Sequence, residues 1–371
     1  SRAVAVVDLA AITHNVRTLA ARTATPVMAV VKADGYGHGA VPAARAALAG
    51  GAAMLGVAYP SEAVALRAAR VDAPLLAWVW APDDDITAAL AAGVALGVSS
   101  VPQLERVLAA RVSGAVIHLK VDTGLGRGGA GPADWDTLCQ RVGVAAADGL
   151  VRVEGVMSHL GSSEVIGDAS IGEQRAVFED ALAAARAAGL VPRYRHLANT
   201  AAALGTPDTR YDLVRCGIGV YGLDPLDETG LRDRHGLRPA MSLRSTVALT
   251  KRVPAGQGVS YGFTYRTTAE TTLALVPIGY ADGVPRAASS RAEVATGGRR
   301  YRLAGRVAMD QVVIDVGDDV VAAGDEVILF GDGRDGAPTA ADWAVACDTI
   351  DYEIVTRIGA RVPRAYREFT G

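Results

Sequence analysis

A lysine at the end of a buried strand is the residue of this sequence best placed for covalent chemistry. Residues 27–40 read VMAVVKADGYGHGA, so five apolar residues precede Lys32 and three glycines follow within seven positions. A short continuous apolar run is typical of a strand buried on both faces, and glycines let a backbone approach a ligand closely. Burying an ammonium is costly, but a Schiff base removes its charge. The stretch thus leaves two interpretations open: a Schiff-base lysine, or one that extends its amine from the strand end to solvent.

Length and composition narrow the classes of protein to which the chain can belong. Its 371 residues, half of them apolar, predict about two domains. The net charge of −3 without a basic stripe predicts no nucleic-acid partner. We also expect no membrane segment or secretory signal, since no apolar run reaches about 18 residues and no basic stretch leads into one. Three cysteines without CxxC spacing argue against disulfides and a metal site, and favour the cytoplasm.

The first two thirds of the chain alternate between two patterns. Apolar runs recur, and segments of helical period rich in Ala, Leu, Arg and Glu separate most of them. Eight such alternations in about 220 residues predict an α/β fold, a parallel (β/α)8 TIM-type barrel over residues 10–235. The expected strands are 27–31, 54–58, 75–80, 94–98, 116–121, 151–157, 194–198 and 213–221.

The remaining residues, 236–371, predict a mostly antiparallel β domain, because β-branched runs alternate with turns of Gly, Pro and Asp. One helix interrupts the strands, beginning at a capping-box-like Thr339. The short strand near the N-terminus, within residues 1–9, is expected to pack with this domain. The expected strands are 243–253, 271–277, 301–303, 306–316, 326–330 and 361–367.

Polar residues follow the predicted barrel strands at their carboxyl ends, where barrels place their chemistry. Taken singly, His159 is explained as a core histidine and Arg127 as a solvated charge. The loops after strands seven and eight are the usual phosphate site of barrels, which suits Thr200, the amides of 217–219 and the hydroxyl of Tyr36. A phosphate site, a Schiff-base lysine and no nucleotide fingerprint together suggest pyridoxal phosphate. The rim residues are Lys32, Lys120, Arg127, His159, Asn199, Thr200, Arg215, Gly217 and Ile218.

Seven blocks of this sequence resemble the alanine racemase family, pyridoxal-phosphate enzymes built from a barrel and a β domain. The match runs nearly end to end, and the first block, around Lys32, is highly specific. The blocks read AVVKADGYGHGA, LKVDTGLGRGG, HLANTAAAL, VSYGFTY, IGYADGVPR, GRVAMDQ and YEIVTRIGARVPR.

The resemblance implies a two-base racemisation of L- and D-alanine through an external aldimine, with D-alanine supplied for peptidoglycan. Lys32 would bind the cofactor and act as one acid/base group, and Tyr261 of the partner subunit would be the other. An unperturbed tyrosine titrates near pH ~10, and the family assists it by a chain through His159 and Arg215 to the ring nitrogen. The implied assembly is therefore a homodimer with shared sites.

The resemblance assigns the other site residues by position. The cofactor contacts would be Lys32, Tyr36, His159, Asn199, Thr200, Arg215, Gly217, Ile218 and Tyr352. Arg127 and Met309 would bind the substrate carboxylate, and Met309 would come from the partner subunit. Lys120, often carbamylated in the family, would orient Arg127, while Tyr280 and Asp310 would line the entrance. Without the resemblance, Met309 is explained as core, Tyr261 and Tyr280 as packing residues, and Asp310 as a turn residue.

The chain departs from the family pattern at three places, and three other functions remain in view. Residues 160–164 read LGSSE where a Phe-Ala-like continuation is usual, Cys216 replaces a proline, and Ala308 replaces a cysteine. These departures leave substrate size open, so a racemase of another amino acid such as serine is the first alternative. A related decarboxylase would place an acidic residue, not Arg215, at the ring nitrogen. A non-catalytic cofactor carrier would lack the β domain and its tyrosine.

Overall fold

The computed structural model describes residues 2–226 and 235–367, except for the side chain of Asp335. The chain forms two compact units. One contains Ile12–Gly35 and Ala40–Leu237, and the other contains Ser1–Ala11, Tyr36–Gly39 and Arg238–Gly371. The domain boundary between residues 235 and 236 stays a prediction.

The larger unit is a ring of eight parallel strands, as predicted. Neighbouring strands pair in the order β8-β7-β6-β5-β4-β3-β2-β9. At the seam between β8 and β9, two backbone hydrogen bonds continue the ring, from Asp212 N to Arg195 O at 3.1 Å and from Arg215 N to Ala198 O at 3.0 Å. The strands are β2 (Val27–Val30), β3 (Met54–Val57), β4 (Leu75–Ala77), β5 (Ala95–Val98), β6 (Ala115–Lys120), β7 (Val151–Met157), β8 (Tyr194–His196) and β9 (Val214–Cys216).

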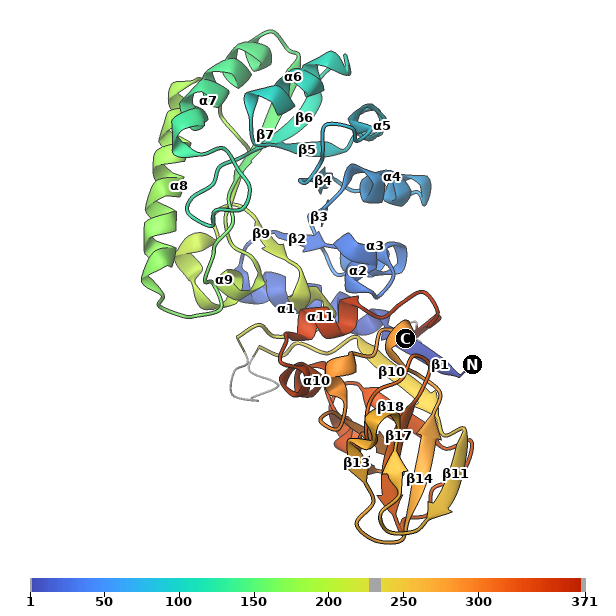
Figure 1. The fold of residues 1–371 in the computed structure, drawn as a ribbon. Helices are drawn as coiled ribbons and strands as arrows, with labels where there is room; N and C mark the ends of the chain where they lie inside the picture. The colour runs from blue at the N-terminus through green and yellow to red at the C-terminus, as the bar shows by residue number, and fades with distance from the viewer. Residues whose placement is uncertain (1, 227–234, 368–371) are drawn as a thin grey trace. The chain divides into compact units, whose positions relative to one another are not determined.

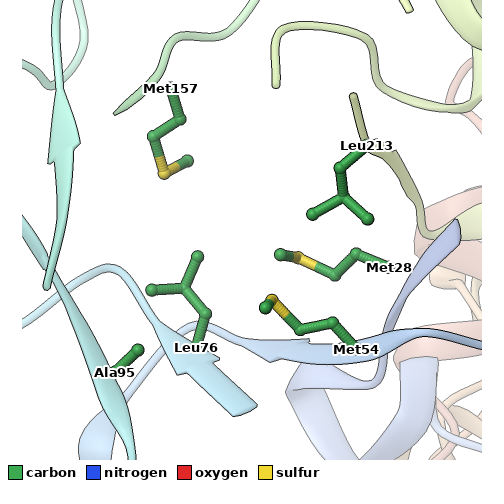
Figure 2. Packing of buried hydrophobic residues seen from close by; sticks show 6 residues of the cluster. All are labelled: Met28, Met54, Leu76, Ala95, Met157 and Leu213. Carbon is green, nitrogen blue, oxygen red and sulfur yellow. The ribbon is translucent and has the colours of Figure 1, made fainter. Parts of the chain in front are cut away.

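Apolar side chains fill the inside of this ring, so the barrel is a packed core rather than a pore. Figure 2 shows residues from around the ring pointing toward a common centre. Trp78 packs against this cluster, and glycine makes room for it: a Cβ on Gly56 would lie 2.5 Å from the indole. The cluster consists of Met28, Met54, Leu76, Ala95, Met157 and Leu213.

Helices lie outside the strands (Figure 1), and their starts follow ordinary capping chemistry. Asp8 accepts a hydrogen bond from Ala11 N at the start of α1. Ser100, Asp168 and Asn199 cap later helices in the same way. The helices are α1 (Leu9–Thr23), α2 (Lys32–Tyr36), α3 (Ala40–Ala49), α4 (Pro60–Ala68), α5 (Ile86–Ala91), α6 (Val101–Ala109), α7 (Pro132–Ala147), α8 (Ala169–Ala187) and α9 (Thr200–Gly205).

The other unit is mostly antiparallel β structure, also as predicted. Its six-stranded sheet runs β16-β15-β18-β10-β1-β19, beside a three-stranded sheet β11-β14-β17 and the pair β12-β13. β1 pairs antiparallel with β10 and parallel with β19. The elements are β1 (Ala3–Asp8), β10 (Met241–Thr246), β11 (Leu249–Val253), β12 (Gly258–Val259), β13 (Tyr265–Arg266), β14 (Thr271–Val276), β15 (Glu293–Thr296), β16 (Arg299–Arg302), β17 (Val312–Gly317), β18 (Glu326–Phe330), β19 (Arg364–Arg367), α10 (Ala340–Cys347) and α11 (Asp351–Thr356).

Several expected strands were too long: 75–80 ends at Ala77, 361–367 begins only at Arg364, and three others differ more from the structure. The run 213–221 ends as a strand at Cys216, because Gly217 turns the chain and Ile218–Tyr221 forms a buried 3₁₀ turn. The run 243–253 divides between two sheets, since Val247 N bonds to Asp325 O while Ala248 N bonds to Leu275 O. The run 306–316 becomes a strand only at Val312. In each case the apolar or β-branched run indicates that the segment is buried, but not that it is extended. A buried turn, or a strand that passes from one sheet to another, has the same pattern.

The helix expected at Thr339 is confirmed, with a reciprocal capping box between Thr339 and Asp342. The following helix, α11, was not foreseen, nor were β12, β13 and β15. In the part of the chain that the structure describes, no helix has the length and apolar character needed to cross a membrane.

Candidate active site

Lys32 follows β2 after one residue, Val31, and begins a turn of unusual handedness. Ala33, Asp34 and Gly35 have left-handed helical φ/ψ values, and Tyr36 has φ 52°. Left-handed backbone costs a non-glycine residue about 1–2 kcal/mol, so this turn needs support from its surroundings. The strain lies immediately after the residue predicted to do covalent chemistry, which is where such strain is most often functional.

Glu62, at the start of α4, provides much of that support. Its carboxylate accepts hydrogen bonds from Ala33 N at 2.6 Å, Ala58 N at 2.9 Å and Tyr59 N at 3.0 Å. Asp34 holds the other end of the turn by accepting from Ala40 N at 2.8 Å. Glu62 also lies close enough for its negative charge to oppose the lowering of the pKa of Lys32. The sequence reasoning missed Glu62, which is neither at a strand end nor in a glycine-rich loop.

Four cationic side chains gather at the carboxyl ends of the strands: Lys32, Lys120, Arg127 and Arg215. Burial, followed by the charge of Arg127, lowers the pKa of Lys32. Burial lowers the pKa of Lys120 to about 8, and the charges of Arg215, Arg127 and Lys32 act in the same direction. The negative charges of Glu62, at Lys32, and of Asp122, at Lys120, oppose these shifts. An anionic ligand would relieve this mutual repulsion.

Arg215 is buried on β9, and neutral groups accept its hydrogen bonds. Its Nη1 donates to His196 O at 2.7 Å, and its Nη2 donates to Ser158 O at 2.6 Å and Leu197 O at 3.0 Å. Nη2 also lies 3.2 Å from His159 Nδ1. Among the described residues, no carboxylate forms an ion pair with Arg215. Burial lowers its pKa to about 10, which still leaves the guanidinium charged at neutral pH.

The contact with Arg215 fixes the tautomer of His159. A guanidinium can only donate, so His159 Nδ1 accepts and the ring proton is on Nε2. Burial, with the charges of Arg215, Arg127 and Lys120, lowers the pKa of His159 to about 2. The imidazole is therefore neutral, with its Nε2–H available as a donor.

The expected phosphate loops are close together in the structure. Thr200 begins α9, and its hydroxyl oxygen accepts from Gly217 N at 3.1 Å and Gly219 N at 3.5 Å. A Cβ on Gly219 would lie 2.6 Å from Thr200 Cγ2, so only glycine permits this approach. Asn199 uses both ends of its amide within the protein, accepting from Ala202 N and donating to Ser163 Oγ at 2.7 Å. Its predicted cofactor contact stays a prediction.

The departures from the family pattern fit their places without removing a polar group. Cys216 is fully buried with a hydrogen bond to Thr200, and burial raises the pKa of its thiol to about 12. Leu160 is buried, and Gly161 N donates to Gln174 Oε1 at 3.0 Å. Ala308 O accepts from Tyr280 N at 3.0 Å.

Tyr36 and Tyr352 come together in the β-rich unit. Their ring centroids are 6.4 Å apart, and Tyr36 is nearly buried. Arg364 donates to Gly37 O at 3.0 Å, and a Cβ on Gly37 would lie 2.5 Å from Val355 O. These contacts hold residues 36–39 against α11 and β19.

The remaining predicted site residues lie on exposed loops of the same unit. Tyr261, Met309 and Tyr280 expose 69%, 52% and 41% of their surfaces. The backbone beside Tyr261 is strained, with φ 58° at Ser260 and 47° at Phe263, and Ser260 Oγ donates to Arg306 O at 2.6 Å. Asp310 accepts a hydrogen bond from Arg361 at 2.7 Å.

Two buried histidines were also missed by the sequence reasoning. His118 on β6 and His196 on β8 are fully buried and lie side by side, with His118 Nδ1 2.9 Å from His196 Nε2. His196 Nδ1 in turn lies 3.2 Å from Arg215 Nη1. Both histidines could have been found from the sequence, because each lies within a predicted buried strand. A buried histidine needs a polar partner, so two of them in the same barrel indicate a polar contact in its core.

Comparison with known proteins covers both units. Residues 7–225 match the model for the alanine racemase N-terminal domain, and residues 240–366 match that for its C-terminal domain. The alanine racemase of Frankia casuarinae is 56% identical over 369 residues, covering 98% of this chain and 96% of that protein. That of Thermobifida fusca is 56% identical over 364 residues, covering 97% and 96%.

Solved structures agree with these matches. A crystal structure of alanine racemase from D-cycloserine-producing Streptomyces lavendulae has a TM-score of 0.98 and 50% identity, covering 100% of this chain and 98% of that one. The Streptomyces coelicolor enzyme has a TM-score of 0.96 and 49% identity, covering 98% of each chain. The chain therefore belongs to the alanine racemase family, whose amino-acid isomerase activity it shares.

Proposed function

We propose that this chain interconverts L- and D-alanine on pyridoxal phosphate bound at the carboxyl ends of the barrel strands, with Lys32 and Tyr261 as the two acid/base groups. The observation that carries the proposal is the cluster of four cations at the strand ends, one of which is Lys32 with its lowered pKa. Such a cluster is suited to a ligand with a phosphate and to a substrate with a carboxylate.

The donor set fits the cofactor that the family uses. Lys32 offers an amine for the carbonyl carbon, and the Thr200 hydroxyl with the loop amide of Ile218 suits the phosphate. The amide of Gly217, which donates to Thr200 in this structure, would join them. Tyr36 and Tyr352 would add hydroxyl donors to the same group. Bound pyridoxal phosphate supplies an electron-withdrawing ring that stabilises negative charge at the substrate Cα.

Arg215 is assigned to the ring nitrogen. Because its guanidinium stays charged and is a donor only, it would hold that nitrogen by a hydrogen bond without giving up its proton. A carboxylic acid there would transfer its proton and strengthen electron withdrawal. Arg215 therefore favours racemisation over reactions that need a stronger electron sink, including the decarboxylase alternative.

Racemisation requires a proton to leave one face of Cα and return to the other, so two groups must act from opposite sides. The lowered pKa of Lys32 brings its amine closer to the range in which it can both accept and donate a proton. Tyr261 would act on the other face. The Nε2–H of His159 points to a donor role toward that phenol, which would stabilise the charge that Tyr261 carries as a base.

Arg127 is assigned to the substrate carboxylate, with Met309 beside it. Lys120 would orient Arg127 after carbamylation. A pKa of about 8 leaves roughly a tenth of the amines neutral at pH 7. The ammonium loses one proton, the neutral nitrogen attacks carbon dioxide and loses a second proton, and a carbamate anion thereby replaces a cation. That change would convert repulsion between Lys120 and Arg127 into attraction. Tyr280 and Asp310 would line the entrance.

A homodimer follows if Tyr261 and Met309 act on the partner's barrel, and their exposure supports this arrangement. Mixing a Lys32→Ala chain with a Tyr261→Phe chain tests it. With random exchange, half of the dimers are hybrids and each has one intact site, so activity should return to about a quarter of the unmodified value. No recovery after exchange would place both groups on one chain.

The assignment of Lys32 is tested by Lys32→Ala. We expect the loaded protein to lose its yellow colour and its racemase activity, while Lys251→Ala, an exposed lysine of β11, keeps both. Full activity in Lys32→Ala would overturn the assignment.

Substrate choice is tested with a panel of L-amino acids and added pyridoxal phosphate, following the loss of optical rotation. Alanine should be turned over faster than serine and larger substrates. A better substrate than alanine would direct attention to Leu160, Cys216 and Ala308. We also propose a cytoplasmic location, supported by three buried unpaired cysteines, and D-alanine for peptidoglycan as the product.

A further inference from the structure

The hydrogen bonds of Arg215 continue away from the site into the barrel core. His196 Nδ1 lies 3.2 Å from Arg215 Nη1, and His196 Nε2 lies 2.9 Å from His118 Nδ1. The two imidazoles meet edge to face, with ring centroids 5.0 Å apart and an interplanar angle of 80°. His118, His196 and Arg215 thus form a continuous chain from β6 through β8 to β9.

Arg215 determines which group donates and which accepts in both hydrogen bonds of the series His118–His196–Arg215. Because the guanidinium can only donate, His196 Nδ1 must accept and His196 carries its proton on Nε2. That proton is donated to His118 Nδ1, so His118 carries its own proton on Nε2. Both rings are therefore neutral, and burial agrees by lowering the pKa of His118 to about 3 and that of His196 well below its usual value.

The chain ends on a donor without an acceptor. Within the described residues, His118 Nε2 is buried and has no hydrogen-bond partner. A leucine would fill the same volume without an unpaired donor, so packing alone does not explain the imidazole. What His118 provides is the acceptor at Nδ1, which orients the ring of His196.

Gly155 on β7 makes the chain possible. A Cβ at this position would lie 2.2 Å from His118 Nδ1, so any other residue would displace the ring. Without a side chain there, His118 reaches across β7 to His196 although β6 and β8 are not neighbouring strands. The next contact, to Arg215, crosses the seam between β8 and β9.

We propose that His118 and His196 are positioning residues that hold Arg215 as a charged, correctly oriented donor toward the cofactor ring. The lone pair of His196 faces the guanidinium, and each bond polarises the next. The hydrogen-bonded series His118–His196–Arg215, here called the relay, offers the guanidinium a neutral acceptor. A carboxylate in its place would neutralise the guanidinium charge and weaken the hydrogen bond that Arg215 donates to the cofactor ring. This inference rests on the proposed role of Arg215 at the cofactor.

The relay itself is tested in the unliganded chain by ¹⁵N NMR of labelled histidine at neutral pH. We expect both rings to be neutral and protonated on Nε2. In His118→Leu the Nε2–H signal of His196 should shift, and in His118→Asn it should stay near its original position, because the asparagine oxygen occupies the place of Nδ1. A cationic ring, or His196 protonated on Nδ1, would overturn the relay.

Its consequence is tested in the loaded enzyme. His118→Leu should lower kcat about tenfold with KM changed less than threefold, and should shift the absorption band of the bound cofactor. His118→Asn should recover most of kcat. Met54→Ala, a core truncation away from the relay, is the control for lost stability and should leave the absorption band in place.

A double-mutant cycle with Arg215→Lys separates positioning from packing. If His118 acts through Arg215, then His118→Leu should change kcat less than twofold in the Arg215→Lys background. A full tenfold loss in that background would make His118 a packing residue. Should the unmodified chain fail to bind pyridoxal phosphate, the proposed function fails, whereas the NMR measurement still decides whether the relay exists.

Discussion

The two predicted acid/base groups occupy opposite kinds of environment. Lys32 follows a fully buried strand, and the side chains assigned to support it, such as Arg215, are buried and hydrogen-bonded. Tyr261 exposes 69% of its surface and lies among other exposed residues, including Phe263 at 59%. The barrel site therefore carries its electrostatic environment within one unit. The tyrosine loop, residues 260–263, has a strained backbone, and the side chain of Tyr261 is largely exposed. Such exposure is expected of a group that functions against another surface.

This contrast has an energetic consequence. Substitutions of the buried residues of the barrel site, such as Arg215, should alter stability and activity together, because these side chains have buried partners. Substitutions at the tyrosine loop should alter activity alone. Stability of the barrel can be followed separately, since three of the four tryptophans, Trp78, Trp80 and Trp135, lie in it.

The largest effect on stability is expected from acid. His118, His159 and His196 have pKa values of about 3, about 2 and well below 6.5 in the folded chain. The unfolded chain binds protons at these residues below about pH 6.5, whereas the folded chain does not. The free energy of unfolding is therefore unaffected by them above that pH and decreases as the pH falls toward 3. His118 and His159 each lower the free energy of unfolding by about 1.4 kcal/mol per pH unit, or about 2 kcal/mol at pH 5, and His196 acts in the same direction.

Urea unfolding followed by tryptophan fluorescence at several pH values measures this slope. His118→Asn should lower this slope by about 1.4 kcal/mol per pH unit between pH ~6.5 and ~5. A slope unchanged by that substitution would mean that His118 is protonated in the folded chain.

The next largest effect is expected from Arg215→Leu. Removing the guanidinium leaves Ser158 O, His196 O and Leu197 O without their donor, at a cost of about 3–5 kcal/mol. The barrel transition in urea should move accordingly, and cofactor binding should weaken. A variant as stable as the unmodified chain would contradict the view that the barrel site couples stability to function.

A smaller effect is expected from Thr339→Ala in the β-rich unit. The substitution removes the hydroxyl that caps α10 and forms half of a capping box. The free energy of unfolding should fall by about 1 kcal/mol. Hydrogen exchange of the α10 amides should increase, while kcat stays the same. Thr339→Ser keeps the hydroxyl and should behave like the unmodified chain.

The smallest effect on stability is expected from Tyr261→Phe, within about 0.5 kcal/mol, because the hydroxyl is exposed. Loss of an acid/base group should nonetheless lower kcat by about 10²–10⁴-fold. Tyr59→Phe is a matched control on another exposed tyrosine, which exposes 52% of its surface. A large loss of stability with little loss of activity would remove Tyr261 from the proposed mechanism.

The sequence by itself determined the order and number of barrel strands, because burial on both faces leaves continuous apolar runs. It also located Lys32 and His159 at strand ends and Arg215 within the last strand of the barrel, since parallel strands place their carboxyl ends at one rim. It did not determine where extended backbone stops: the apolar run 213–221 contains both a strand and a buried turn.

Only the tertiary structure decided which partners each polar group has. Glu62 reaches the turn after Lys32 from thirty residues away, and His118 contacts His196 because Gly155 leaves space between their strands. The tautomers of three histidines then follow from one arginine. Such contacts depend on strand register and on the space left by a missing side chain, and neither is encoded in the local pattern of residues.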